Sequence, residues 1–261
     1  MLPLLISIVF LMQMINIYRT FIFSLLTAGL MFSVACNKES YTPPSPFNNL
    51  DDDSTDTTIN IKRLLALGDS YTIGQGVTEA DRFPNQTINL LRSQGIQVKY
   101  PATIVAQTGW TTQALLNGIV NAGNTVSGTY DLVTLLIGVN NQYQGRDTVE
   151  YRIQFNQCLD KAISFAGNQK QRVFVLSIPD YGVTPFGSGN AAQIALEIDR
   201  FNAINKDICT QRGINYTDIT GSTREAANDP GLICSDSLHP SGIEYAKWAR
   251  MLAPKMLPVI Q

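Results

Sequence analysis

The sequence predicts an α/β fold, a three-layer α/β/α sandwich with a five-stranded parallel sheet, formed by residues 61–261. Two observations predict it. Short apolar runs, typical of parallel strands buried on both faces, alternate along the chain with longer amphipathic segments. Five such strand–helix units in about 200 residues favour a doubly wound sheet, whose ligands are expected beyond the carboxyl ends of the strands.

The expected elements follow in strict alternation. Strands are predicted over residues 63–67, 102–106, 132–137, 173–178 and 214–219. Helices are predicted over residues 85–94, 112–121, 149–166, 191–212 and 241–260. The third helix shows the pattern clearly, because Phe155, Leu159 and Ile163 recur on one face. Each helix is therefore expected to cover the sheet with an apolar side.

Composition excludes two classes of function. Charged residues make up 15% of the 261 residues and the formal net charge is -2, without a cluster of Lys and Arg. Binding to nucleic acid is therefore not expected, because it requires such clusters to neutralise phosphates. Four Cys without CxxC spacing and one His also argue against a structural zinc site. We expect no metal and no nucleic-acid partner.

Residues 1–35 are interpreted as a signal peptide of the lipoprotein type. They contain no Asp, Glu or Lys and a single Arg19, and Ser33-Val-Ala directly precedes Cys36. Small residues before a cysteine resemble a bacterial lipobox, in which Cys36 is lipidated. A permanent transmembrane helix is the alternative, since the apolar run is of spanning length. Either way, we expect an exported protein of the bacterial cell envelope, anchored to the membrane and facing the periplasm or the cell surface.

An acidic flexible linker is predicted over residues 36–60. Its only basic residue is Lys38, against five acidic ones, and it contains Pro43-Pro44-Ser-Pro46. Such a segment buries too little apolar surface to fold. It is expected to act as a tether between the membrane and the folded domain.

Three residues suggest a catalytic triad. The first strand leads into Gly68-Asp69-Ser70, and a Ser at a strand end can present its hydroxyl to solvent, although a helix cap is the simpler reading. The only imidazole, His239, lies after the fifth strand and therefore at the same sheet edge. Asp236 precedes it by three residues, a spacing at which a carboxylate can orient the ring. We predict Ser70, Asp236 and His239 as nucleophile, orienting acid and base.

Two further strand ends supply candidate oxyanion donors. Gly109 follows the second strand, and Asn140 in Gly138-Val-Asn140 follows the third. Together with the Ser70 backbone N–H, the Gly109 N–H and the Asn140 amide are predicted to form an oxyanion hole. Taken singly, each glycine is more often a plain turn.

These four blocks resemble, in order, those of the SGNH (GDSL-type) hydrolase family. The resemblance covers roughly residues 61–255. It implies a flavodoxin-like sheet and hydrolysis of esters through an acyl-enzyme on Ser70, without a cofactor. Asn141 departs from the family pattern, which usually has Asp there, and the surroundings of Gly109 lack the usual Asn.

We therefore expect a serine esterase, monomeric, acting on lipid, short-chain or carbohydrate O-acyl esters. The alternatives are a catalytically silent lipoprotein on the same fold that binds glycans or lipids, and a structural envelope lipoprotein. The sequence leaves the substrate open. Tyr181 and Phe186 either line a substrate pocket or belong to a surface turn, and the same holds for Trp110 and Tyr143.

Three cysteines lie in the predicted domain. Cys158 falls within an apolar helix face and is expected to be a buried thiol. For Cys209 and Cys234, a disulfide and two free thiols stay equally open, with the disulfide bracing the loop that carries Asp236 and His239.

Overall fold

The computed structural model describes residues 60–261. The predicted signal peptide, Cys36 and the predicted linker up to residue 59 lie outside the described residues. Within the described part of the chain, no helix is both long enough and apolar enough to cross a membrane.

Five strands form a single parallel sheet in the order β2-β1-β3-β4-β5. They are β1 (Leu64–Gly68), β2 (Thr103–Ala106), β3 (Leu132–Leu136), β4 (Val173–Leu176) and β5 (Asn215–Thr217). The three central strands are buried along their whole length, whereas the edge strands are partly exposed. The expected α/β sandwich with a five-stranded parallel sheet is confirmed. Near-continuous apolar runs predicted it because central parallel strands are covered on both faces.

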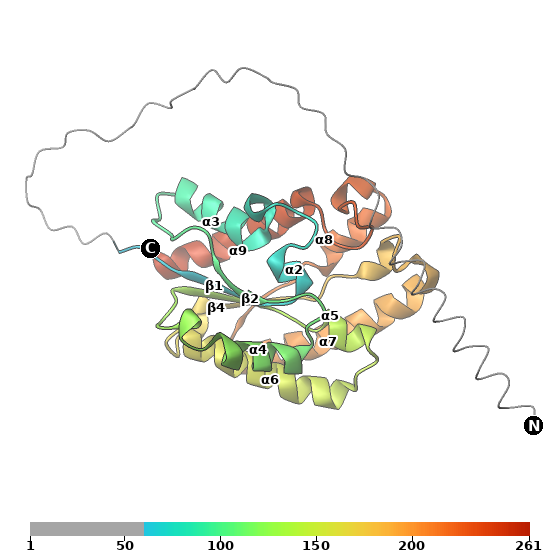
Figure 1. Cartoon of the computed structure of the whole chain (residues 1–261), viewed down its shortest axis with the longest axis horizontal. Coiled ribbons are helices and arrows are strands. Elements are labelled where there is room, and N and C mark those ends of the chain that lie inside the picture. Colours follow the sequence, from blue (N-terminus) through green and yellow to red (C-terminus); the bar gives the residue numbers. More distant parts are fainter. Residues whose placement is uncertain (1–59) are drawn as a thin grey trace, which may run out of the picture. The chain divides into compact units, whose positions relative to one another are not determined.

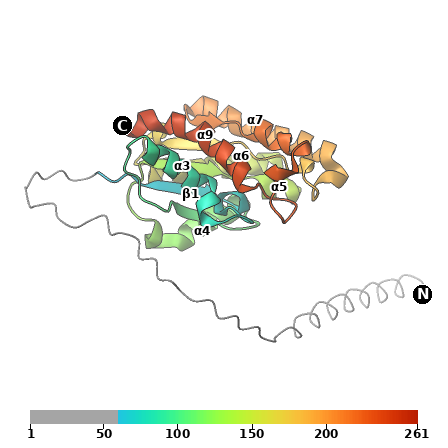
Figure 2. The same ribbon diagram turned by 90° about the horizontal axis from the view of Figure 1, so that it is seen from above.

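Helices cover both faces of the sheet (Figure 1). On one face α3 (Phe83–Ser93) packs along α9 (Gly242–Ile260). The other face carries α4 (Thr112–Ala122), α6 (Thr148–Phe165) and α7 (Ala191–Arg212), in which α6 contacts both its neighbours. Seen from above, α7 and α9 run in nearly the same direction (Figure 2). All five long helices match their predicted ranges to within about two residues at each end, which is the usual uncertainty of helix boundaries.

Short helices that the periodicity did not predict begin at or near the carboxyl ends of three strands. They are α2 (Ser70–Ile73) after β1, α5 (Val139–Tyr143) after β3 and α8 (Thr220–Arg224) after β5. Single 3₁₀ turns lie at Glu79–Asp81, Gly123–Val126, Lys170–Arg172, Tyr181–Val183, Ser188–Asn190, Glu225–Ala227 and Pro230–Leu232. Elements of three to five residues span about one turn and are too short to show a helical repeat.

The strand order reverses between β1 and β3. The chain leaves β1 for β2 on one side and then returns to β3 on the other side. At such a switch point the connections leave in opposite directions, which opens a crevice at the carboxyl ends of the strands. The segments that follow β1 and β3, which carry Ser70 and Asn140, flank this crevice.

All three described cysteines are free. Cys158 and Cys209 are fully buried, and Cys234 is partly buried. Of the two alternatives for Cys209 and Cys234, the structure has the free thiols. Burial raises the pKa of the Cys158 and Cys209 thiols to about 12, so both are protonated at neutral pH.

Candidate active site

Ser70 lies where β1 turns into α2. Asp69 caps this helix, because its carboxylate accepts a hydrogen bond from the Tyr71 N–H at 3.0 Å. Gly68 ends the strand without room for a side chain, since a Cβ there would collide with the Thr72 side chain and the Leu136 carbonyl. The Gly-Asp-Ser sequence thus brings the helix start tightly over the strand end, which places Ser70 above the sheet edge.

Asp69 is itself fully buried. Burial raises the pKa of its carboxyl from 3.8 to about 7, although the Tyr71 N–H opposes this by stabilising the ionised form. The residue beside the proposed nucleophile therefore stays largely protonated in mildly acidic solution.

The imidazole of His239 is held by Asp236. His239 Nδ1 lies 2.6 Å from Asp236 Oδ2, while Asp236 Oδ1 accepts hydrogen bonds from the N–H groups of Leu238 and His239 at 3.0 and 2.9 Å. The turn is closed by the Cys234 N–H, which donates to the His239 carbonyl at 2.8 Å, and Ser237 adopts a φ of 65° at its tip. The spacing of three residues thus lets one carboxylate fix both the turn and the ring.

The Asp236 carboxyl is ionised at neutral pH. Partial burial raises its pKa, but contacts from the Cys234 thiol, the backbone and ring of His239 and the Leu238 N–H outweigh burial and hold the pKa well below its usual value. The Cys234 Sγ lies 3.0 Å from Asp236 Oδ1. A negative charge is therefore available to stabilise a protonated His239 ring.

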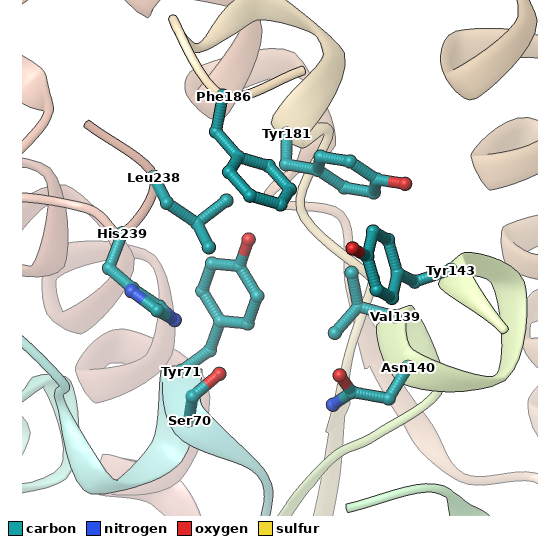
Figure 3. Close-up of a pocket in the computed structure, with 9 residues that line it drawn as sticks. All are labelled: Ser70, Tyr71, Val139, Asn140, Tyr143, Tyr181, Phe186, Leu238 and His239. Carbon is teal, nitrogen blue, oxygen red and sulfur yellow. The ribbon is translucent and has the colours of Figure 1, made fainter. Parts of the chain in front are cut away.

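Ser70 and His239 line one cavity of about 430 Å³. Figure 3 shows the Ser70 hydroxyl and the outer ring nitrogen of His239 facing the same space. Both residues are nearly inaccessible, with exposed fractions of 5% and 3%. Among the described residues, no hydrogen bond joins the Ser70 hydroxyl to the ring. Such a contact often tightens only when substrate binds.

Asn140 lines the same cavity from the side of β3. One hydrogen of its amide donates to the Trp110 carbonyl at 3.0 Å, which fixes the amide and leaves its second hydrogen available. The Ser70 N–H at the start of α2 makes no hydrogen bond within the described part of the chain. Gly109, with φ of 82°, is exposed and is not among the residues that line the cavity. Of the predicted oxyanion donors, Ser70 and Asn140 line one cavity, and Gly109 does not line it.

Two neighbours of Asn140 set its position. Gly138 adopts a φ of 131°, and a Cβ there would lie 2.5 Å from Tyr151 Oη and 2.7 Å from Ile178 Cδ1. Asn141 is buried, accepts a hydrogen bond from the Thr112 N–H at 2.9 Å and donates to Thr112 Oγ1 at 2.8 Å. The amide at this position thus ties α5 to the start of α4.

Three aromatic rings close the cavity on the side opposite Ser70 (Figure 3). Tyr143, Tyr181 and Phe186 all line it. Of the two alternatives for these residues, a pocket or a surface turn, the structure has the pocket. The Phe186 N–H donates to the Ser237 carbonyl at 3.1 Å, which joins the aromatic loop to the turn that carries His239. Trp110 instead packs over Gly118 of α4, where a Cβ would collide with its ring.

Sequence reasoning missed three residues that line the cavity and one contact. Tyr71, Val139 and Leu238 line it, and each is a direct chain neighbour of a predicted site residue. That adjacency was the available signal. The contact between Cys234 and Asp236 was hidden, because two residues in a turn face each other only for particular backbone angles.

Known proteins similar to this chain carry the same architecture. A model of the GDSL-like lipase/acylhydrolase family matches residues 66–247. Among curated proteins, none matches the chain.

Solved structures match the fold over nearly their whole length. A family 3 carbohydrate esterase of Clostridium thermocellum has a TM-score of 0.60 at 19% identity, covering 77% of this chain and 97% of that one. A lipase/acylhydrolase of Enterococcus faecalis has a TM-score of 0.60 at 15% identity, covering 77% and 98%. A member of the lipolytic G-D-S-L family from Veillonella parvula has a TM-score of 0.55 at 21% identity, covering 76% and 97%. Identities this low establish a shared fold alone.

Proposed function

The chain belongs to the GDSL-like lipase/acylhydrolase family, and from that premise we propose that it is a serine esterase that forms an acyl-enzyme on Ser70. The observation that carries the proposal is the meeting of Ser70 and His239 in one cavity, with Asp236 2.6 Å behind the ring. The names of similar structures, which include a carbohydrate esterase and a lipase/acylhydrolase, support hydrolysis of esters in general.

The first half-reaction makes the acyl-enzyme. Ser70 Oγ attacks the ester carbonyl carbon while His239 Nε2 takes the hydroxyl proton, and the ionised Asp236 stabilises the resulting imidazolium. The tetrahedral intermediate then collapses, the bond to the alcohol oxygen breaks, and His239 returns the proton to that oxygen. The free alcohol leaves.

The second half-reaction consumes water. His239 takes a proton from the water molecule, whose oxygen attacks the acyl carbon, and then returns it to Ser70 Oγ as the acid departs. In both steps the oxyanion is stabilised by the Ser70 N–H and the Asn140 amide. The chemistry needs water and no cofactor.

Ser70→Ala tests the proposal. Removing the nucleophile is expected to lower kcat for p-nitrophenyl acetate by at least about 10⁴-fold, because the triad acts as a unit. It is also expected to abolish labelling by a fluorophosphonate probe, while the circular dichroism spectrum stays that of the wild type. Ser93→Ala, which removes an exposed hydroxyl on α3, is the matched control. Wild-type hydrolysis by the Ser70 variant would reject the mechanism, and a wild type without labelling or turnover would favour a silent binding protein.

We also propose that the enzyme is exported and works as a monomer tethered to the cell envelope through a lipid on Cys36. The support is the sequence pattern Ser33-Val-Ala-Cys36 after an apolar segment. Expressed in a bacterium, the full chain is expected in the membrane fraction. A Cys36→Ser variant that stayed there unchanged would contradict the anchor.

A further inference from the structure

A second groove adjoins the catalytic cavity. It encloses about 890 Å³ and shares Tyr143, Tyr181 and Phe186 with the cavity, so the three rings face both spaces. The remaining wall comes from α5, the turn Ser188–Asn190 and α7. We call this space the side groove, defined by Gln142, Tyr143, Tyr181, Phe186, Asn190 and Glu197. A group attached to an ester held at Ser70 reaches the side groove by passing these rings.

The aromatic rim of the side groove is open to solvent. Tyr143 and Phe186 are 60% and 53% exposed, although large aromatic side chains are usually buried. Their ring centroids lie 6.0 Å apart, and each lies 6.2 Å from that of Tyr181 (Figure 3). Apolar ring faces clustered beside a catalytic cavity favour a ligand with an apolar face of its own.

Another wall of the groove offers hydrogen-bond acceptors. The amides of Gln142 and Gln193 donate to the two oxygens of Glu197 at 2.6 and 2.5 Å. These donors hold the pKa of the Glu197 carboxyl below its usual range, so it is ionised. The Gln142 Oε1 atom is buried and has no hydrogen-bond partner among the described residues. Because that atom is enclosed, the acceptor that the groove presents to a ligand is the Glu197 carboxylate, which the two amides hold in place.

This wall selects among the possible ester classes. An alkyl chain has no donor for the Glu197 carboxylate and would take its charge out of water without compensation. An anionic head group would be repelled by the ionised Glu197. A neutral polyhydroxyl ligand satisfies both walls, because its hydroxyls donate to the acceptors while the C–H face of its ring packs on Tyr143 and Phe186.

We propose that the side groove binds a sugar unit, so that the substrate is an O-acylated saccharide whose acyl group enters the catalytic cavity. The inference rests on the proposed esterase function. Val139, Leu238 and the ring of Tyr71 line the catalytic cavity together with Ser70 and offer apolar contacts to an acyl group. The saccharide is then the alcohol that leaves when the acyl-enzyme forms.

The test compares two esters with the same acyl group. Partially acetylated xylo-oligosaccharides, which keep free hydroxyls, are compared with p-nitrophenyl acetate, which has none. Glu197→Ala is expected to lower kcat/KM for the oligosaccharide at least tenfold more than kcat/KM for p-nitrophenyl acetate, through KM. Tyr143→Ala is expected to do the same, while Tyr143→Phe keeps the ring and restores binding. Asp207→Asn, which removes a carboxylate of α7 that pairs with Arg152 and lines neither the cavity nor the side groove, is the matched control and leaves both rates unchanged.

The outcomes distinguish a failure of the sugar site from a failure of the esterase proposal. Equal losses for the two esters, or no loss for either, would overturn the sugar site while the esterase proposal stands. A wild type that prefers p-nitrophenyl palmitate to the acetylated sugar would overturn it too. A wild type that hydrolyses no ester and takes no fluorophosphonate label would overturn the esterase proposal and the sugar site with it.

Discussion

Asn140 has two amide hydrogens and uses one of them for the Trp110 carbonyl. That bond holds the amide in place, and the amide end of Asn140 lies toward the cavity that Ser70 and His239 also line (Figure 3). A donor held in place before the reaction costs no reorganisation when charge develops, which is why such groups stabilise transition states effectively.

Asn140→Ala is therefore expected to lower kcat about 100- to 1000-fold, with little change in KM, because the lost contact strengthens only in the transition state. Steady-state kinetics with p-nitrophenyl acetate give both constants. Asn117→Ala, which removes an exposed amide on α4, is expected to match the wild type. A wild-type kcat for the Asn140 variant would reject this donor and leave the triad untouched.

At the level of elements, three short helices lie at the carboxyl ends of strands. α2, α5 and α8 start where β1, β3 and β5 end, and the first two bring Ser70 and Asn140 to the crevice. Their positions depend on close contacts more than on helix propensity. Gly138 is the plainest case, because its φ of 131° and its contact with Tyr151 leave no room for a side chain.

Gly138→Ala is expected to lower the free energy of unfolding by about 1–3 kcal/mol from backbone strain, with a further loss from the collision with Tyr151. It is also expected to reduce kcat, since α5 carries Asn140. Urea denaturation and kinetics on the same sample measure the two effects. Gly221→Ala in α8, where nothing lies within 4 Å of the added Cβ, is expected to be neutral or slightly stabilising. Equal stability of the two variants would contradict the strain.

Across the whole molecule, the sheet gathers the site from distant parts of the chain. Ser70 follows the first strand and His239 precedes the last helix, yet both line one cavity. The same packing buries Asp69 completely beneath this site and raises the pKa of its carboxyl to about 7. The folded protein therefore holds a proton that the unfolded chain releases near pH 4. As a result, the free energy of unfolding depends on pH through Asp69.

Relative to Asp69→Asn, the wild type is expected to lose stability as the pH rises from 5 to 8. Between the two pKa values the folded state binds more protons, so the free energy of unfolding contributed by Asp69 falls with rising pH. Each pKa unit corresponds to about 1.4 kcal/mol, which puts the full change at a few kcal/mol. Denaturation of both proteins across this range measures the difference. The other titrating groups are common to both proteins and therefore cancel, and the Asn side chain keeps an acceptor for the Tyr71 N–H. A difference that did not vary with pH would show that Asp69 is not protonated in the folded state.

The amino-acid sequence by itself determined the strand and helix alternation and the parallel sheet, because burial on one or both faces imposes a repeat that is legible in the chain. It also pointed to Ser70, Asp236 and His239, since a Ser at a strand end and a lone imidazole three residues after an acid are local patterns. Tertiary structure alone decided that Tyr143 faces the cavity while Trp110 packs on Gly118, and that Gly109 stands outside the cavity lining. Those outcomes depend on how side chains pack in three dimensions, and such packing leaves no repeat or spacing in the sequence.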